Sequence, residues 1–406
     1  MSESSEHQGV VSPQGSVPNY SLWQMVQYAL KLGSIGFGGP IALVGYMHRD
    51  LVEDRKWISE SEYSEGMTLA QVAPGPLAAQ LAIYLGYVHY GLLGASLVGI
   101  SFVLPSFFMV VALGWAYMRY GGLSWMQAVF YGVGACVIGI IALSAYKLTV
   151  KIVKGPLLWS IFVVTTAVTV IRETEEVLVI LGAGVLVWLV KAPPKDWFSR
   201  SKLMGINLSP LILLAQTGVP GGDANLLLSI FLFFAQAGSF VFGSGLAIVP
   251  FLYGGVVKNY HWLTDKQFVD AVAVAMITPG PVVITVGFVG YLVAGLAGAT
   301  VAALATFLPC YLITVLAAPY FKKHGKQSGI AEFVNGVTVA ATGAIAGAVI
   351  VLGRKSIIDI PTALIALVTL ALLWHFKKKL PEPIVVLAAA LIGLVIYPLT
   401  QKFSPS

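Results

Sequence analysis

The chain has 406 residues, of which 57% are hydrophobic and only 10% are charged. Soluble domains are about 25% charged, so a soluble fold of this size could not bury so much apolar surface. The net charge of +6 comes from Lys and Arg residues that lie in loops between apolar segments rather than on one basic face. This distribution argues against nucleic-acid binding.

The chain begins with a polar segment, residues 1–20, that is rich in Ser, Gln and Pro. It has no basic stretch leading into a short apolar core. We therefore expect a disordered N-terminal tail and no cleavable signal peptide.

Long uncharged windows dominate the rest of the chain. Residues 66–118 and 271–321 contain no Asp, Glu, Lys or Arg, and each window is long enough for two membrane crossings of roughly 20 residues. A membrane β-barrel would instead show alternating segments of about ten residues. The pattern predicts an all-α integral membrane protein in contact with lipid. Shorter uncharged windows follow at 120–146, 155–171, 224–257, 333–353, 360–376 and 383–401.

An internal repeat relates the two halves of the chain at an offset of 205 residues, which becomes 204 after one deletion. Pro74-Gly75-Pro76 corresponds to Pro279-Gly280-Pro281, and Trp57 corresponds to Trp262. One deletion over more than a hundred residues indicates a duplication. The predicted domains are a first transporter repeat (21–192), an inter-repeat linker (193–224), a second repeat (225–398) and a C-terminal tail (399–406).

Loop charges predict that the two halves have inverted topology, because short cytoplasmic loops are rich in Lys and Arg. In the first half the basic loops are 147–155 and 191–202, whereas in the second half they are 322–326 and 377–379, which correspond to charge-poor loops of the first. The mixed loop 353–359 weakens this pattern without reversing it.

Inversion requires an odd number of crossings in each half, yet each half offers six apolar elements. We therefore expect about ten membrane crossings in total, plus one broken or re-entrant element per half. The candidates are 21–47 or 64–90, with their counterparts 226–256 or 267–294, because these carry the Gly and Pro clusters.

These clusters are the candidate binding site. Gly and Pro interrupt helices, and opened backbone at membrane depth is tolerated only inside protein or along a wet cavity. Half-helix N-termini can hold an anion there, and paired interruptions in two repeats indicate a site near the membrane midplane. The alternative is that the clusters only permit kinks and close helix packing. The backbone candidates are Gly36, Phe37, Gly38, Gly39, Pro40, Pro74, Gly75, Pro76, Phe242, Gly243, Gly245, Pro279, Gly280 and Pro281.

Side chains near the clusters complete the predicted substrate-binding set. Lys31 is the one basic residue in its apolar segment and either faces the site or snorkels to the interface. Neutral donors suit a tetrahedral oxyanion, although isolated polar residues also form interhelical hydrogen bonds. The neutral candidates are Gln71, Gln80, Ser244, Thr278 and Thr285.

The sequence contains no motif that indicates enzymatic activity. Cys136 and Cys310 lie in apolar stretches without a Cys-x-x-Cys partner, and we find no phosphate-binding loop or nucleophile elbow. The acidic residues fall in loops or at segment edges. We therefore predict no catalytic residues, no metal site, no cofactor and no enzymatic activity, and proton coupling is left without an obvious carrier.

The motifs resemble those of the chromate ion transporter family, specifically its long, two-domain members. The first-half resemblance covers Lys31 to Gly33, Phe37 to Ala42, Gly45-Tyr46, Arg55, Trp57, Glu60, Tyr63 and Gln71 to Gln80. The second half is similar through Phe242 to Pro250, Trp262, Pro279 to Pro281 and Gly290-Tyr291. The resemblance implies secondary export of chromate, which confers chromate resistance, across the cytoplasmic (inner) membrane of a bacterium.

Three alternatives stay open at this point. The cargo could be sulfate or another small oxyanion, the direction could be uptake, and the protein could be a passive anion channel. The prediction also allows a homodimer.

Overall fold

The computed structural model describes residues 19–37, 39–174, 176–193, 223–241, 245–324, 328–376 and 381–403. Every regular element within these ranges is a helix, which confirms the all-α prediction. Most of the predicted tail (1–20) and linker (193–224) lies outside the described residues. The last helix continues through Pro398 to Phe403.

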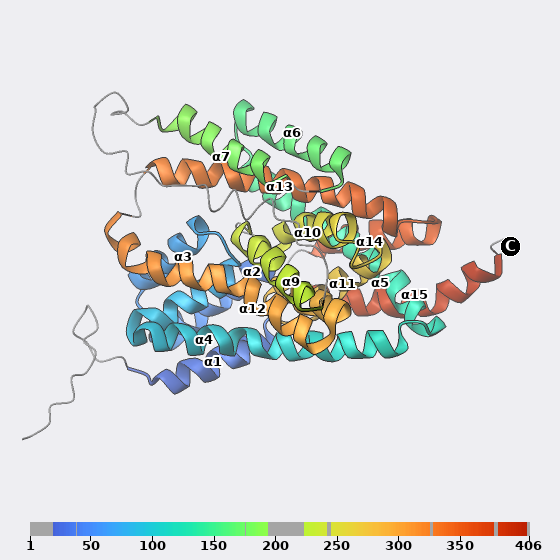
Figure 1. Cartoon of the computed structure of the whole chain (residues 1–406), viewed down its shortest axis with the longest axis horizontal. Coiled ribbons are helices and arrows are strands. Elements are labelled where there is room, and N and C mark those ends of the chain that lie inside the picture. The colour runs from blue at the N-terminus through green and yellow to red at the C-terminus, as the bar shows by residue number, and fades with distance from the viewer. Residues whose placement is uncertain are drawn as a thin grey trace, which may run out of the picture.

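The helices follow the repeat seen in the sequence (Figure 1). In the first half they are α1 (Leu22–Ile35), α2 (Gly39–Met47), the π-helix η1 (His48–Asp54), α3 (Glu60–Val72), α4 (Leu77–Tyr120), α5 (Ser124–Ile152), α6 (Pro156–Arg172) and α7 (Val177–Lys191). In the second half they are α9 (Asp223–Ser239), η2 (Gly245–Ala247), α10 (Ile248–Leu252), the π-helix η3 (Tyr253–Asn259), α11 (Asp265–Ile277), η4 (Val282–Ile284), α12 (Thr285–His324), α13 (Ser328–Ser356), α14 (Ile360–Phe376) and α15 (Glu382–Phe403).

The same local signal starts α3 and its counterpart α11. Ser59 and Thr264 are N-caps whose side chains accept from the backbone N–H groups of Glu62 and Gln267. The Glu62 and Gln267 side chains accept in turn from the N-cap backbone, at 2.9 Å in both helices. These two capping boxes fix where each helix begins and therefore where each later Pro-Gly-Pro break falls.

A sharp turn folds α4 back on itself at Gly91, where the backbone has φ 57° and ψ −147°. A Cβ added to Gly86 would lie 2.5 Å from the Gly94 carbonyl oxygen, a contact that a straight helix cannot make across eight residues. α12 repeats this turn at Gly295, with φ 60°. The predicted elements 64–90 and 267–294 thus each end in the first arm of a helical hairpin.

The two halves are intertwined through their last two helices. α6 and α7 of the first half pack along α13 of the second, while α14 and α15 pack along α5 of the first. α5 also packs against α13, and α4 against α12. In Figure 1 the long segments of α4 and α12 run in opposite directions, as the colour gradient shows.

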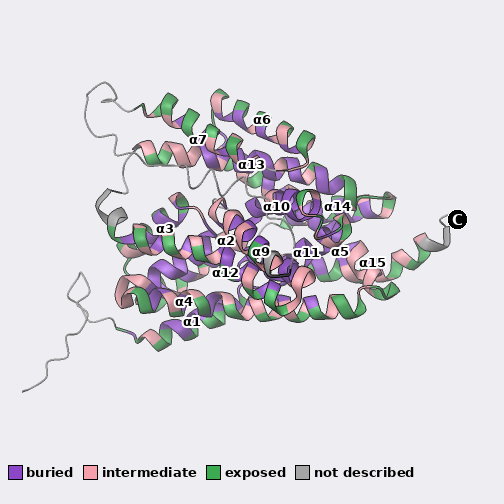
Figure 2. Ribbon diagram, in the orientation of Figure 1, coloured by how far each residue is buried: buried purple, intermediate pink, exposed green. Residues whose placement is uncertain are grey.

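The interior of the fold lies around α5 and α13. The most apolar window of each is 72% buried, whereas that of α15 is 22% buried. Buried residues gather at the centre of Figure 2, and α6, α7 and α15 carry exposed residues along their outer sides.

The outer surface carries many large, exposed apolar side chains, which a water-soluble protein would bury. Five helices within the described ranges are long and apolar enough to cross a membrane: α4, α5, α12, α13 and α15. Four shorter apolar helices accompany them: α6, α7, α9 and α14. Ile171 and Ile360 are 79% and 77% exposed, as expected for side chains that face lipid. The fold is therefore that of a multi-pass membrane protein.

Candidate functional site

The helix interruptions of both halves meet at two reciprocal backbone hydrogen bonds. The Gly75 N–H donates to the Val241 carbonyl at 2.5 Å, and the Gly280 N–H donates to the Gly36 carbonyl at 2.8 Å. Gly75 and Gly280 are repeat-equivalent, as are Gly36 and Val241. Each half thus supplies one donor and one acceptor. We call the region formed by these four residues the junction.

Both donor positions require glycine. Gly75 has φ 139° and Gly280 has φ 94°, a backbone region that side chains with a Cβ rarely adopt. A Cβ at Gly75 would lie 2.4 Å from the Cβ of Cys310, and one at Gly280 would lie 2.0 Å from the Ser106 Oγ. Ser106 and Cys310 are repeat-equivalent positions of α4 and α12, so the same close approach occurs twice.

In this conformation the Gly75 and Gly280 N–H groups donate to backbone carbonyls of the protein. The sequence had instead predicted that backbone N–H groups at these breaks face an anion-binding pocket. An unpaired N–H in an apolar interior costs several kcal/mol. Pairing each donor with a carbonyl of the opposite half removes that cost. An anion that uses these amides must therefore displace the two carbonyls.

Helix N-termini surround the junction. α2 begins at Gly39 and α4 at Leu77, and the corresponding elements of the second half begin at Gly245 and Val282. Pro76 and Pro281 occupy N-cap positions without a capping side chain. The first N–H groups of a helix carry partial positive charge, which favours an anion or another hydrogen-bond acceptor.

Gln80 is the predicted polar residue that lies closest to this arrangement. Its side chain is fully buried, and its Nε2 donates to the Pro74 carbonyl at 2.8 Å. Its Oε1 is buried without a hydrogen-bond partner among the described residues. Because buried polar atoms are almost always paired, this acceptor indicates that a hydrogen-bond donor such as a water completes the region.

Thr278 and Thr285 are buried beside the second break but donate to backbone carbonyls of the preceding turn. The Thr278 hydroxyl donates to the Val274 carbonyl at 2.8 Å, and the Thr285 hydroxyl donates to the Val282 carbonyl at 2.7 Å. Each hydroxyl still has lone pairs to accept with, but its proton is engaged.

The other predicted residues divide by burial. Gly36, Pro76, Gly245, Pro279 and Pro281 are buried with the junction, and Phe37, Gly39, Pro40 and Pro74 are partly buried. Lys31 and Gln71 are exposed and do not join this group. Gly38, Phe242, Gly243 and Ser244 lie outside the described residues.

Sequence reasoning missed Asp270. The expectation was that acidic residues lie in loops or at segment edges, but Asp270 lies within α11 and is 3% exposed. The Tyr117 hydroxyl donates to its Oδ2 at 2.7 Å. A signal was present, because Glu65 occupies the equivalent position of the first repeat and the two longest uncharged windows begin directly after these two acids.

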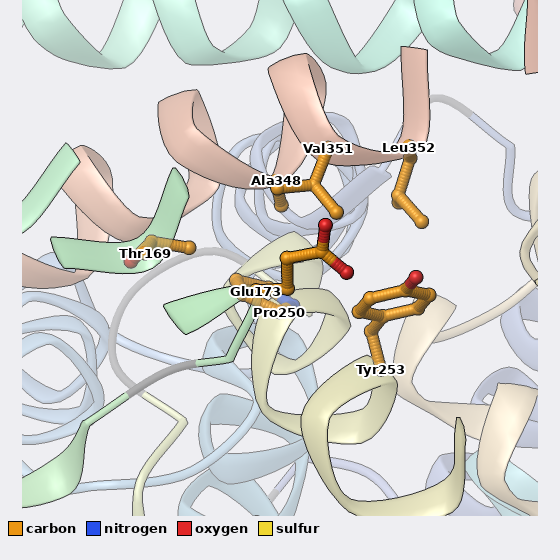
Figure 3. A pocket seen from close by; sticks show the side chains of 7 residues that line it. All are labelled: Thr169, Glu173, Pro250, Tyr253, Ala348, Val351 and Leu352. Atoms are coloured by element: carbon orange, nitrogen blue, oxygen red, sulfur yellow. The ribbon is translucent and has the colours of Figure 1, made fainter. Parts of the chain in front are cut away.

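A polar layer lies at the N-terminal end of α11, beside the hollow shown in Figure 3. Glu173, which pairs with Lys258, and Tyr253 line this hollow. The Tyr253 hydroxyl donates to Asp265 at 2.5 Å. Burial would raise the pKa of Asp265, but this hydrogen bond and the nearby Lys355 ammonium hold it below its ordinary value. Asp265 is therefore ionised at neutral pH.

The fold and the junction together define a multi-pass, all-helical membrane protein whose helices are broken at matching positions in its two halves. The sequence model of the chromate transporter family matches residues 23–188 and again residues 228–394. The chain belongs to the chromate transporter family.

Close relatives cover nearly the whole chain. It is 68% identical to a chromate transport protein of Cupriavidus metallidurans, over 95% of each chain. It is 67% identical to a probable chromate transport protein of Synechococcus elongatus, over 94% of this chain and 97% of the relative. It is 29% identical to a chromate transport protein of Pseudomonas aeruginosa, over 94% of each chain. No solved structure matches this chain.

Proposed function

We propose that this protein is a secondary transporter that exports chromate from the cytoplasm and thereby confers chromate resistance. The dianion binds between the two repeats, at the junction. The observation that carries this proposal is the reciprocal pair of hydrogen bonds, because it joins the helix interruptions of one half to those of the other at buried residues. The names of the relatives at 67% and 68% identity support chromate as the cargo.

The chemistry of the junction suits a doubly negative tetrahedral anion. Backbone N–H groups can bind an oxyanion without a dense cluster of arginines, which would be hard to bury. Our proposed pocket uses the amides of Gly75 and Gly280, the N-termini of α2 and α4 and their counterparts, and the Gln80 amide. It leaves out the exposed Lys31 and Gln71.

We also propose that the halves have inverted topology, with about ten crossings, in the cytoplasmic membrane of a bacterium. The reversed distribution of basic loops supports this, as do the opposed directions of α4 and α12. In such an arrangement the junction lies on an axis that relates the halves, and small movements of one half against the other expose it to either side.

Export is the direction that the membrane potential favours. A charge of −2 that leaves a negative-inside cytoplasm gains about 4.6 kcal/mol per 100 mV, twice the value for one elementary charge. This electrical term alone can drive export of chromate against a concentration gradient.

The test is uptake of radiolabelled chromate into everted membrane vesicles, where uptake corresponds to export from the cell. We expect voltage-driven accumulation that excess sulfate reduces only weakly. Equal competition by sulfate would make the protein a general oxyanion transporter. Accumulation only in right-side-out vesicles would make it an uptake system, and flux far above transporter rates without a dependence on driving force would make it a channel.

Replacement of Gln80 by leucine tests the pocket side chain. We expect the initial rate of chromate transport to fall about tenfold, since a hydrogen bond to a charged group contributes about 1.5–3 kcal/mol. The measurement is the rate per amount of folded protein in the same vesicles. Thr300→Val is a matched control, because Thr300 is an exposed residue of α12 that bonds only to its own helix. Normal transport by Gln80→Leu would remove Gln80 from the pocket.

A further inference from the structure

Asp270 is a buried carboxyl without a cationic partner among the described residues. Its one hydrogen-bond partner there is the Tyr117 hydroxyl, and its neighbours in α11 from Phe268 to Met276 are all buried. A carboxylate taken out of water without a cation is far costlier to bury than a neutral carboxylic acid. This conformation therefore favours the protonated form.

Among the described residues, no charged group on α11 or on the elements packed against it forms an ion pair with Asp270. Lys266, on the same helix, acts on it only from an exposed position. η4, residues 285–319 of α12 and residues 383–400 of α15 contain no charged residue, and Arg119 of α4, Lys151 of α5 and Arg354 of α13 are exposed. Other charged and titratable groups on elements packed against α11 have partners elsewhere. Lys147 of α5 interacts with Glu382 of α15, and Lys355 of α13 pairs with Asp265. Glu332 of α13 pairs with Lys191, His89 of α4 with Glu62, and Lys258 of η3 with Glu173.

Asp270 stands between the solvent-side polar layer and the junction. It lies five residues after Asp265 and eight before Thr278, which corresponds to about 7.5 Å and 12 Å along the helix axis. A negative charge at the junction would meet a charged Asp270 across a low-dielectric interior, where repulsion is stronger than in water. A dianion and a carboxylate at these positions disfavour each other.

Helix α4 contacts both Asp270 and the junction. α4 carries Ser106, which packs against Gly280, and Tyr117, which bonds to Asp270. These α4 residues are eleven apart, about three helical turns, and therefore lie on one face of the helix. A movement that separates Gly280 from α4 also changes the Tyr117 contact and the access of water to Asp270.

We infer that Asp270 is a proton-binding residue whose protonation is coupled to occupancy of the junction by the anion. This inference rests on the proposed function. Protonated Asp270 allows the dianion to bind, and binding raises the fraction of Asp270 that is protonated. When the anion leaves and water reaches the carboxyl, Asp270 releases its proton to water. The apparent affinity for chromate is consequently highest at low pH and falls as the pH rises.

Glu65 provides an internal comparison at the equivalent position of the first repeat. It is only partly buried and accepts from the Tyr84 hydroxyl at 3.2 Å. A partly hydrated carboxylate does not carry the burial cost that sets Asp270 apart. Coupling is therefore assigned to the second repeat alone in this conformation.

The experiment measures chromate transport by the full chain in proteoliposomes, at fixed voltage, from pH 6 to pH 8.5. In the wild type we expect the apparent KM to rise by up to about tenfold per pH unit where Asp270 titrates. Asp270→Asn, which keeps the shape and a hydrogen-bond acceptor but cannot ionise, should lack this rise in apparent KM. Protonation of chromate itself contributes equally to both proteins and cancels in the comparison.

Three further variants make the outcome decisive. Asp270→Glu should keep the pH dependence, and Glu65→Gln should behave as the wild type. Asp270→Ser replaces Asp270→Asn if the latter does not fold, and it should also lose the pH dependence. A wild-type pH slope in a neutral variant would overturn the inference while leaving chromate transport intact. A wild type that moves no chromate at any pH would instead overturn the proposed function.

Discussion

Replacement of Gly280 by alanine is expected to reduce the initial rate of chromate transport at least about tenfold. At φ 94° an alanine backbone is strained by about 1–3 kcal/mol, and the new Cβ would lie 2.0 Å from the Ser106 Oγ. Overpacking of this kind costs about 1–3 kcal/mol more. The displaced segment can no longer donate to the Gly36 carbonyl, so one of the two bonds that join the halves is lost.

Transport by Gly280→Ala is measured as chromate uptake into everted vesicles, normalised to folded protein from size-exclusion chromatography. Gly45→Ala is the control, because a Cβ at this α2 position meets nothing within 4 Å and its backbone is unstrained. Adding Ser106→Gly to Gly280→Ala removes the steric clash but not the backbone strain, so it should restore the rate in part. Full activity of the single variant would mean that the junction geometry is not needed for transport.

The sequence predicted the places where the helices break but not the partners of the broken ends. Gly36, Gly75 and Gly280 stand out because Gly and Pro have special backbone preferences. Val241 does not, since it contributes only its carbonyl and every residue has one. The offset of 205 residues identifies equivalent positions, but equivalence is not contact, and the bonds join Gly75 to Val241 rather than to Gly280.

The sequence also did not predict that the last two helices of each half pack against the other half. α6, α7, α14 and α15 are apolar on most sides, as membrane helices are, so their patterns do not indicate which long helix each one covers. The sequence also did not predict the hydrogen-bond partners of the polar side chains near the breaks. Thr278 and Thr285 carry donors suited to an anion, yet a hydroxyl in a helix readily bonds to a carbonyl of the preceding turn.

Replacement of Gly132 by leucine is expected to destabilise the whole protein. Gly132 lies where α5 crosses α15, and a Cβ there would lie 2.0 Å from the Ala389 carbonyl oxygen and 3.0 Å from the Gly393 Cα. Close crossings of small residues hold membrane helices together, because lipid provides no hydrophobic force between them. Separating the helices to fit leucine costs about 1–3 kcal/mol or more, and we expect a fall of several degrees in melting temperature or loss of folded protein.

The control for Gly132→Leu is the same substitution at Gly182, an exposed position of α7 where a Cβ meets nothing within 4 Å. Both changes gain the same helix propensity, about 0.8–1 kcal/mol over glycine, so their difference isolates the packing at the crossing. Gly336 is the repeat equivalent of Gly132. A Cβ added to Gly336 would lie 2.6 Å from the Ala183 carbonyl oxygen of α7. Gly336→Leu should therefore destabilise the protein as well, but less, because its clash is milder. If Gly132→Leu and Gly182→Leu melted alike, α15 would not be held against α5 at this crossing, and the exchange of helices between the two halves would lose its main support.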